Sequence, residues 1–413
     1  MSKNLKRIPG GVTAAKGFLA GSASCSIKRT PPKDGVPRKD LCLVVSESVA
    51  TAAGVFTTNL VKAAPVLLSR RHLESGKARA VLLNSGNANA CTGEEGLRAA
   101  EQCANGAAVA LGIDADEVLV CSTGRIGVQL PLAKMIPGIR SAAASLKPAA
   151  TAARDAAIAI MTSDSVPKQS AYEVRVGSDS FRVGGMAKGA GMISPNMATM
   201  LCLITTDAAV PAAFLRKALR EAVSTTFNCI TVDGDCSTND TVVTLANGLS
   251  GTRIRTASDQ KAFAAALQAV CADLARAIVA DGEGTSRVIE LTVTGARSAA
   301  EANLAARAIA NSQLVKSAWA GGDPNWGRIL DAAGYSGASF DPDRVSIAYD
   351  GLPAVVKGMG CQDMKGELRL RKVAARKEFA VSVDLGAGKG SARLLTTDLT
   401  EKYVRLNLTE FSL

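Results

Sequence analysis

The chain has 413 residues, of which 47% are apolar and 21% are charged, so it can form a packed core, and collagen-like and disordered classes are excluded. The formal net charge is +11, but residues 1–40 carry +7 of it, and aromatic residues that stack on bases make up only 4% of the chain. Nucleic-acid binding is therefore not expected, whereas a modest positive bias suits small carboxylate substrates.

Runs rich in β-branched residues alternate along the chain with Ala-rich stretches that have helical periodicity, and this order predicts a layered α/β or α+β fold. The expected strands are 41–46, 78–84, 117–123, 172–176, 198–206, 288–295, 344–350 and 378–385. The expected helices are 93–112, 148–161, 211–223, 260–282 and 299–318. The Pro-rich stretch 30–40 predicts a loop. The Gly-dense stretch 177–195 also lacks periodicity and leads into a strand, where the backbone can be strained or closely approached.

The ten cysteines form no C-x-x-C pair, which does not match a clustered zinc site and indicates free thiols in a reducing compartment. The opening residues 1–21 lack an apolar signal core with a cleavage site, and no run of 18 apolar residues occurs. We therefore expect a cytoplasmic protein without a membrane span.

A single histidine, His72, limits the catalytic chemistry that is available. It stands in SRRHLESG, which we interpret as an exposed polar turn, so Ser-His or Cys-His catalysis is not expected. The strings 386–391 (GAGKGS) and 188–194 (KGAGMIS) lack the Ser/Thr of a P-loop and the third glycine of a dinucleotide site, respectively. We interpret both as turns and expect neither a cofactor nor a metal.

Two short motifs have both a structural and a chemical interpretation. CSTGRIG (121–127) follows a strand, where it is either an ordinary turn or a source of backbone N–H groups for an oxyanion hole. DGEGTSR (281–287) places Glu283 between glycines, as a solvated charge or as a ligand for an ammonium group.

The junction 188–201 (KGAGMISPNMATML) is more specific. A threonine hydroxyl becomes a good nucleophile when an adjacent base activates it, and a free α-amine on the same residue is such a base. For Thr199 this requires cleavage between Ala198 and Thr199 through an N→O acyl shift. Taken alone, an Ala-Thr pair before a strand does not indicate cleavage, because threonine favours strands.

Six motifs together resemble the ornithine acetyltransferases of arginine biosynthesis, also called glutamate N-acetyltransferases. They are CSTGRIG, KGAGMISPNMATML, TFNCITVDGDCSTNDT, DGEGTSR, LVKSAWAGGDPNWGR and TDLTEKYVRLN. The match runs in order from residue 10 to the C-terminus. The resemblance implies an N-terminal-nucleophile-like architecture and self-cleavage into an α chain 1–198 (N-terminal lobe) and a β chain 199–413 (C-terminal lobe), assembled as two copies of each.

The resemblance also implies a ping-pong reaction in which Thr199 carries the acetyl group from N2-acetylornithine to glutamate. Whether acetyl-CoA is a second acetyl donor stays open. By motif, the oxyanion-hole positions are Thr123 and Gly124, and the substrate-contact positions are Thr162, Lys188, Thr199, Glu283, Asn407 and Ser412. We infer that a cation and an anion, Lys188 and Glu283, serve the carboxylate and δ-ammonium groups of the substrate.

The departures from the family pattern are few. Arg125 stands where an aliphatic residue is usual, and Phe411 and Ser412 stand where Tyr and Thr are common. Ser163 and Ser165 lie close enough to Thr162 to be alternatives for its contact. Two rival hypotheses remain: a self-processing amidase or aminopeptidase in which water accepts the acyl group, and a basic binding protein that does not cleave itself.

Overall fold

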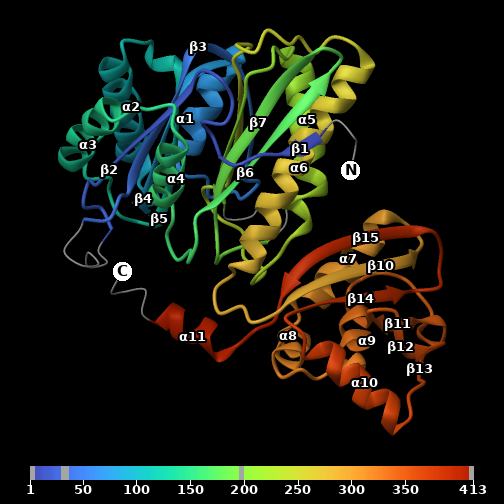
Figure 1. Ribbon diagram of the computed structural model, residues 1–413. Coiled ribbons are helices and arrows are strands. Elements are labelled where there is room, and N and C mark those ends of the chain that lie inside the picture. Colours follow the sequence, from blue (N-terminus) through green and yellow to red (C-terminus); the bar gives the residue numbers. More distant parts are fainter. Residues whose placement is uncertain (1–4, 29–36, 195–199, 409–413) are drawn as a thin grey trace.

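Two β-sheets organise the computed structural model, which describes residues 5–28, 37–194 and 200–408 (Figure 1). Within these residues the first sheet has nine strands in the order β1-β6-β7-β8-β9-β3-β4-β5, with β2 paired to β3. The strands are β1 (Leu5–Arg7), β2 (Phe18–Ala23), β3 (Leu41–Phe56), β4 (Lys77–Asn87), β5 (Val118–Arg125), β6 (Lys168–Val176), β7 (Asp179–Lys188), β8 (Leu201–Thr206) and β9 (Thr241–Ala246). The pairs β4/β5 and β8/β9 are parallel, and the others are antiparallel.

The long strand β3 passes from one half of this sheet to the other. Its first part pairs with β2 and β4, its last part, from Thr51 to Phe56, pairs with β9, and the register with β4 shifts between Val45 and Ala50. Side chains of β2, β4 and β5 share one buried cluster with those of β7, β8 and β9. The two halves are therefore stacked face to face over a common core.

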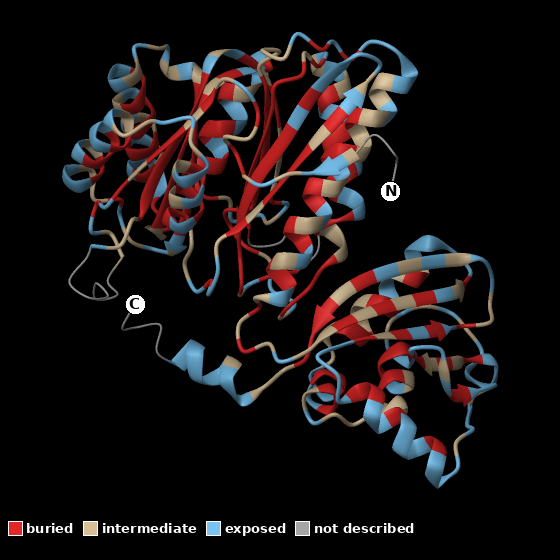
Figure 2. Cartoon of the chain, viewed as in Figure 1, coloured by how far each residue is buried: buried red, intermediate tan, exposed pale blue. Residues whose placement is uncertain are grey.

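Helices cover both outer faces of this stack. Helices α1 (Ala64–His72), α2 (Gly93–Leu111) and α3 (Leu132–Ala144) cover the β2–β5 half, and α5 (Ala212–Thr225) and α6 (Ala257–Ala280) cover the β6–β9 half, with α4 (Ala150–Ala159) beside β2 (Figures 1 and 2). In β8, Leu201 and Leu203 face the common core, whereas Cys202 and Ile204 face α5 and α6. A strand that is buried on both faces is apolar throughout. The predicted α/β layering is confirmed.

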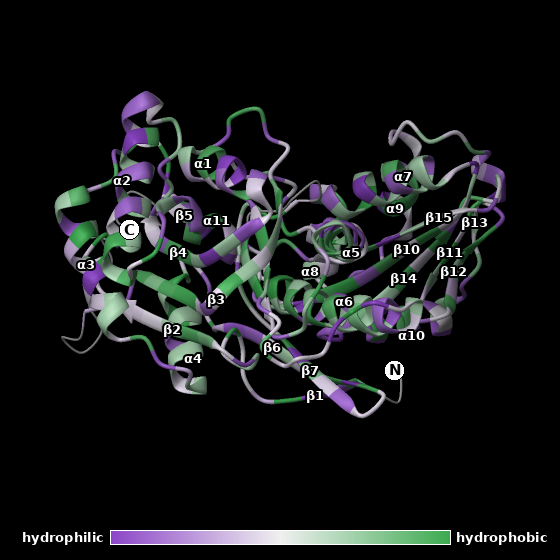
Figure 3. Cartoon of the chain, turned by 90° about the horizontal axis from the view of Figure 1, so that it is seen from above, coloured by the Kyte–Doolittle hydropathy of each residue, from purple (hydrophilic) through white to green (hydrophobic). Residues whose placement is uncertain are grey.

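The second sheet follows after residue 287. Its order is β13-β12-β11-β14-β10-β15, and it packs with α7–α10 around Trp319, Tyr349 and Phe379 (Figure 3). The elements are β10 (Val288–Ala296), α7 (Ala299–Asn311), α8 (Gln313–Ala320), α9 (Trp326–Gly334), β11 (Ser346–Tyr349), β12 (Leu352–Val356), β13 (Met359–Gly360), α10 (Met364–Ala374), β14 (Glu378–Asp384), β15 (Gly390–Thr397) and α11 (Glu401–Leu408). Short 3-10 helices are η1 (Leu73–Ser75), η2 (Ala115–Glu117), η3 (Phe227–Cys229) and η4 (Pro342–Arg344).

The lobes of the molecule are thus divided near residue 287. The expected chain boundary between Ala198 and Thr199 instead falls between β7 and β8, neighbours in the first sheet that pair from Lys188↔Leu201 to Val183↔Thr206. The division into chains 1–198 and 199–413 remains a prediction about maturation. If the chain is cut there, both products contribute strands to one sheet.

Helix α6 is long and apolar enough to cross a membrane by length and composition alone. However, Phe263, Leu267 and Leu274 on this helix belong to the buried cluster that it forms with β6, β7 and α5. Packing against the sheet therefore accounts for its apolar character.

Two sequence predictions need correction. His72 is not exposed: it is buried at the end of α1, where its Nδ1 lies 2.8 Å from the Val118 carbonyl O. The stretch 177–195, in which the sequence shows no periodicity, contains the strand β7. A Cβ atom on Gly184 would overlap the Gly11 carbonyl O. The glycine in this strand therefore reflects close packing against another segment of the chain rather than a turn. CSTGR is likewise the end of β5 and not a turn. The expected loop 30–40 lies mostly outside the described residues.

Candidate active site

Thr123 and Lys188 meet between the two stacked halves of the first sheet. In β5, Thr123 continues the inward row of Leu119 and Cys121, and in β7, Lys188 continues the inward position of Met186. Side chains two residues apart share a face of a strand, so both residues point into the common core. The Lys188 Nζ donates a hydrogen bond to the Thr123 Oγ1 at 3.4 Å, and both residues are buried.

Burial lowers the pKa of Lys188, and the nearby carboxylates of Asp164 and Glu283 oppose that effect. A buried ammonium whose charge is only partly compensated binds an incoming carboxylate strongly. Lys188 is therefore suited to hold an anionic group in this core.

Gly124 follows Thr123 at a kink of β5. Its φ is +131°, a region that favours glycine, and a Cβ atom on it would come within 2.5 Å of the Asn87 N in the neighbouring strand β4. The register between β4 and β5 also shifts here, between Gly86 and Asn87. Only glycine allows the two strands to approach so closely, which explains this residue type beside Thr123. Arg125, the departure from the family pattern, is half-buried next to it.

Asp164 joins the loop of Thr162 to the end of β7. It accepts hydrogen bonds from the Gly189 N–H at 2.7 Å, the Thr162 N–H at 3.0 Å and the Lys168 Nζ at 2.6 Å. Burial would raise its pKa, but the charges of Lys188 and Lys168 hold the pKa at about 2. Sequence reasoning missed this residue, although it is the Asp of MTSD, two positions after Thr162. Ser165 instead donates to Asp281.

Lys168 lies between two buried carboxylates, with its Nζ 2.6 Å from Asp164 and 2.6 Å from Asp281. We expect Lys168→Met to lower the free energy of unfolding by about 3–5 kcal/mol, because it removes the buried cation that these two carboxylates share. Urea unfolding of the variant measures this loss. Lys217→Met is the matched control, because the Lys217–Glu221 pair is exposed and should change stability little. Equal small effects of both substitutions would contradict the prediction.

Glu283 lies beside the same segment of chain. Its N–H donates to the Ala190 carbonyl O at 2.9 Å, and its carboxylate packs against Gly191, where an added Cβ would be 2.5 Å from the carboxylate carbon. Asn407 of α11 donates through Nδ2 to Glu283 Oε2 at 3.0 Å. This bond connects α11, which is labelled in Figure 1, to the loop that follows α6.

The six expected site residues that the structure describes therefore form one connected group around segment 188–191. They are Thr123, Gly124, Thr162, Lys188, Glu283 and Asn407. The expected residues Ala198, Thr199 and Ser412 lie outside the described residues. The group combines a buried cation with a carboxylate, which is the complement of an amino acid that carries a second ammonium group.

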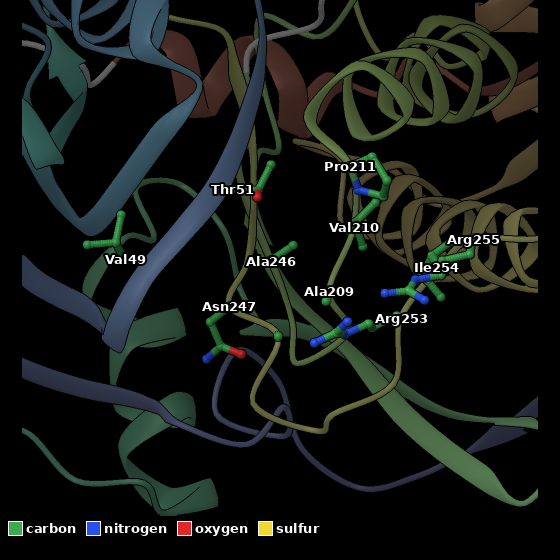
Figure 4. A pocket seen from close by; sticks show the side chains of 11 residues that line it. Val49, Thr51, Ala209, Val210, Pro211, Ala246, Asn247, Arg253, Ile254 and Arg255 are labelled. Carbon is green, nitrogen blue, oxygen red and sulfur yellow. The ribbon is translucent and has the colours of Figure 1, made fainter.

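A cavity of about 400 Å³ lies elsewhere, lined by Thr51, Asn247, Arg253 and Arg255 among others (Figure 4). Most of its lining residues follow the ends of β8 and β9, whereas Lys188 of the candidate site pairs with Leu201 at the start of β8. Six residues of strand separate the two places by roughly 15–20 Å. This cavity is not part of the candidate site.

A family model and the curated relatives match nearly the whole chain. The model of the ArgJ family matches residues 20–410. The arginine biosynthesis bifunctional protein ArgJ of Symbiobacterium thermophilum is 51% identical over 402 residues, covering 97% of this chain and 98% of that protein. The protein of the same name from Geobacter sulfurreducens is 48% identical, covering 95% and 98%. Among solved structures, ornithine acetyltransferase from Mycobacterium tuberculosis, complexed with ornithine, is 40% identical with a TM-score of 0.43, and the match covers 48% of this chain and 100% of that chain.

Proposed function

This chain belongs to the ArgJ family, and from this premise we propose that it is a self-processing acetyltransferase that moves an acetyl group from N2-acetylornithine to glutamate. It is an acyltransferase of arginine biosynthesis that acts on small molecules. The observation that carries the substrate assignment is that the buried cation Lys188 and the carboxylate of Glu283 lie at the two ends of segment 188–191. The N-terminal-nucleophile-like architecture follows from the same family membership.

In the proposed reaction, the Thr199 Oγ attacks the carbonyl carbon of the acetyl group while the α-amine of Thr199 accepts the hydroxyl proton. The C–N bond breaks, the proton passes to the departing ornithine nitrogen, and the acetyl group remains on Oγ as an ester. The amine of glutamate then attacks this ester, and Thr199 recovers its hydroxyl proton. Thr123 and Gly124 would stabilise the oxyanion of both steps. The steps require no cofactor.

Maturation uses the same nucleophile. The Thr199 Oγ attacks the Ala198 carbonyl carbon and the peptide C–N bond breaks, which leaves an ester on Oγ and frees the Thr199 α-amine. Water then hydrolyses the ester, which releases the Ala198 carboxylate and restores the Thr199 hydroxyl. The ladder between β7 and β8 supports lasting association of the two products, because its hydrogen bonds do not depend on the cut bond. A heterotetramer of two α and two β chains and a cytoplasmic location complete the proposal. Acetyl-CoA as a second acetyl donor also belongs to it, and the bifunctional name of the relatives supports that part.

We expect N2-acetylornithine alone to add one acetyl group to the β chain, because the first half-reaction does not need glutamate. Intact mass spectrometry detects this species, and labelled ornithine should exchange into acetylornithine without glutamate. Double-reciprocal plots should give parallel lines. Intersecting lines, with neither exchange nor an acetylated β chain, would restrict Thr199 to maturation.

The amidase alternative predicts a different product. A hydrolase releases acetate from acetylornithine at the same rate with or without glutamate, whereas a transferase forms N-acetylglutamate and little acetate. Measuring both products in the two conditions separates these functions. Rapid acetate release that glutamate does not affect would favour the amidase.

A further inference from the structure

Segment 226–241 (TFNCITVDGDCSTNDT) is one of the matching motifs, yet the proposed reaction gives it no role. Two of its carboxylates accept backbone hydrogen bonds from the chain on either side of the proposed cleavage bond. Asp233 accepts the Met192 N–H at 2.6 Å and the Ile193 N–H at 2.8 Å. Asp240 accepts the Met200 N–H at 3.0 Å. The residues on both sides are therefore held by one loop.

That loop is itself fixed to the first sheet. The Asn239 Nδ2 donates to the Ser122 carbonyl O at 2.8 Å and to the Ala88 carbonyl O at 2.6 Å. The Thr57 Oγ1 donates to the Ser237 carbonyl O at 2.7 Å. Ser122 directly precedes Thr123 in β5. The loop therefore holds the residues that flank the proposed cleavage bond in a fixed position relative to β5, the strand of the expected oxyanion hole.

Burial disfavours the charged form of the Asp233 and Asp240 carboxyl groups. It raises the pKa of Asp233 to about 6 and raises the pKa of Asp240 well above its usual range. The upstream backbone is also held in an unfavourable conformation, since Met192 has a φ of +58° without being glycine. Buried charge and left-handed backbone thus occur together at one point of the fold, which is typical of functional positions.

We propose that Asp233 and Asp240 are positioning residues for self-cleavage, fixing the chain on both sides of the Ala198–Thr199 bond relative to β5. This inference rests on the proposed maturation and adds to it the residues that align the reacting groups. In this role the carboxylates act through the backbone N–H groups of Met192, Ile193 and Met200. Small errors of alignment are expensive in such reactions, because a displacement of about 1 Å slows them by roughly 10²-fold.

The test measures the rate of self-cleavage in the full chain. We expect Asp233→Ala and Asp240→Ala to slow the disappearance of the intact 413-residue chain by roughly 10- to 100-fold, as followed by intact mass after a pulse of synthesis. Asp240→Asn keeps an oxygen that accepts the Met200 N–H, so it should restore most of the rate. A role that depends on the negative charge would not show this order, because the amide is neutral.

Asp207→Ala is the matched control. Asp207 is also buried, and it accepts two backbone hydrogen bonds, from the Lys16 N–H at 2.8 Å and the Arg182 N–H at 2.7 Å, but beyond the far end of β8. Melting temperatures are compared in the Thr199→Ala background, where every chain stays whole. We expect Asp207→Ala to lose as much stability as the other alanine variants and to cleave at the wild-type rate.

The outcomes separate the inference from the function on which it rests. Wild-type rates in both Asp233→Ala and Asp240→Ala would overturn the inference alone, as would equal slowing by Asp207→Ala. If Asp240→Ala fails to fold, slow cleavage by a folded Asp233→Ala, with normal cleavage by Asp240→Asn, still supports it. A wild-type chain that remains whole would overturn the proposed maturation and this inference with it.

Discussion

Alanine at position 199 should leave the purified protein as one chain of 413 residues, with acetyl transfer lowered by roughly 10⁶-fold. The substitution removes the hydroxyl that serves as nucleophile in both maturation and transfer. No histidine can take over, because His72 is the only one and it is buried with its Nδ1 on the Val118 carbonyl O. Substrate binding by the remaining residues cannot replace the lost nucleophile. The effect should therefore be larger than that of any other single substitution at the site.

Intact mass and N-terminal sequencing measure this result. The wild-type protein should give two masses, for residues 1–198 and 199–413, and the second fragment should begin Thr-Met-Leu-Cys. Thr199→Ser is the control, because it keeps a hydroxyl and should still cleave. Cleavage of Thr199→Ala at the same bond would show that another group is the nucleophile.

Alanine at position 123 should slow acetyl transfer by roughly 10²–10³-fold, the usual effect of removing one oxyanion donor. The Thr123 hydroxyl accepts a hydrogen bond from Lys188, so its own proton is free to point toward a substrate oxygen. The fold should change little, because the lost group is one hydroxyl at the end of β5. If both reactions use the same oxyanion hole, maturation will also be slower.

Turnover is compared in fully cleaved protein, so that slow maturation does not enter the result. Thr123→Ser keeps the hydroxyl and should retain most of the activity. Ser122→Ala is the matched control on the opposite face of β5, where the Ser122 Oγ donates to Asn84 Oδ1 at 2.6 Å. Near-normal turnover of cleaved Thr123→Ala would remove this side chain from the active site.

Each of the eight expected strands overlaps an observed strand, and the five expected helical stretches correspond to α2, α4, α5, α6 and the pair α7 and α8. The local patterns that predict them are visible because the periodicity of buried residues is a property of neighbouring positions. Shorter or less regular elements, such as β1, β13 and β15, carry weak signals and were missed. In β7, glycines that serve close packing made a strand resemble a loop.

The sequence by itself determined the chemical groups that this protein can use: one histidine, a threonine after a glycine-dense approach, and motifs that identify the family. Only the tertiary structure decided how these groups are combined. In the folded chain His72 is buried, and Thr123 of β5 contacts Lys188 of β7 although 65 positions separate them. Asn407 forms a hydrogen bond with Glu283. It also revealed Asp164, Asp233 and Asp240, whose roles depend on the partners that they meet. The physical reason is that burial, hydrogen-bond partners and pKa arise from contacts between distant segments, whereas residue identity and periodicity are local.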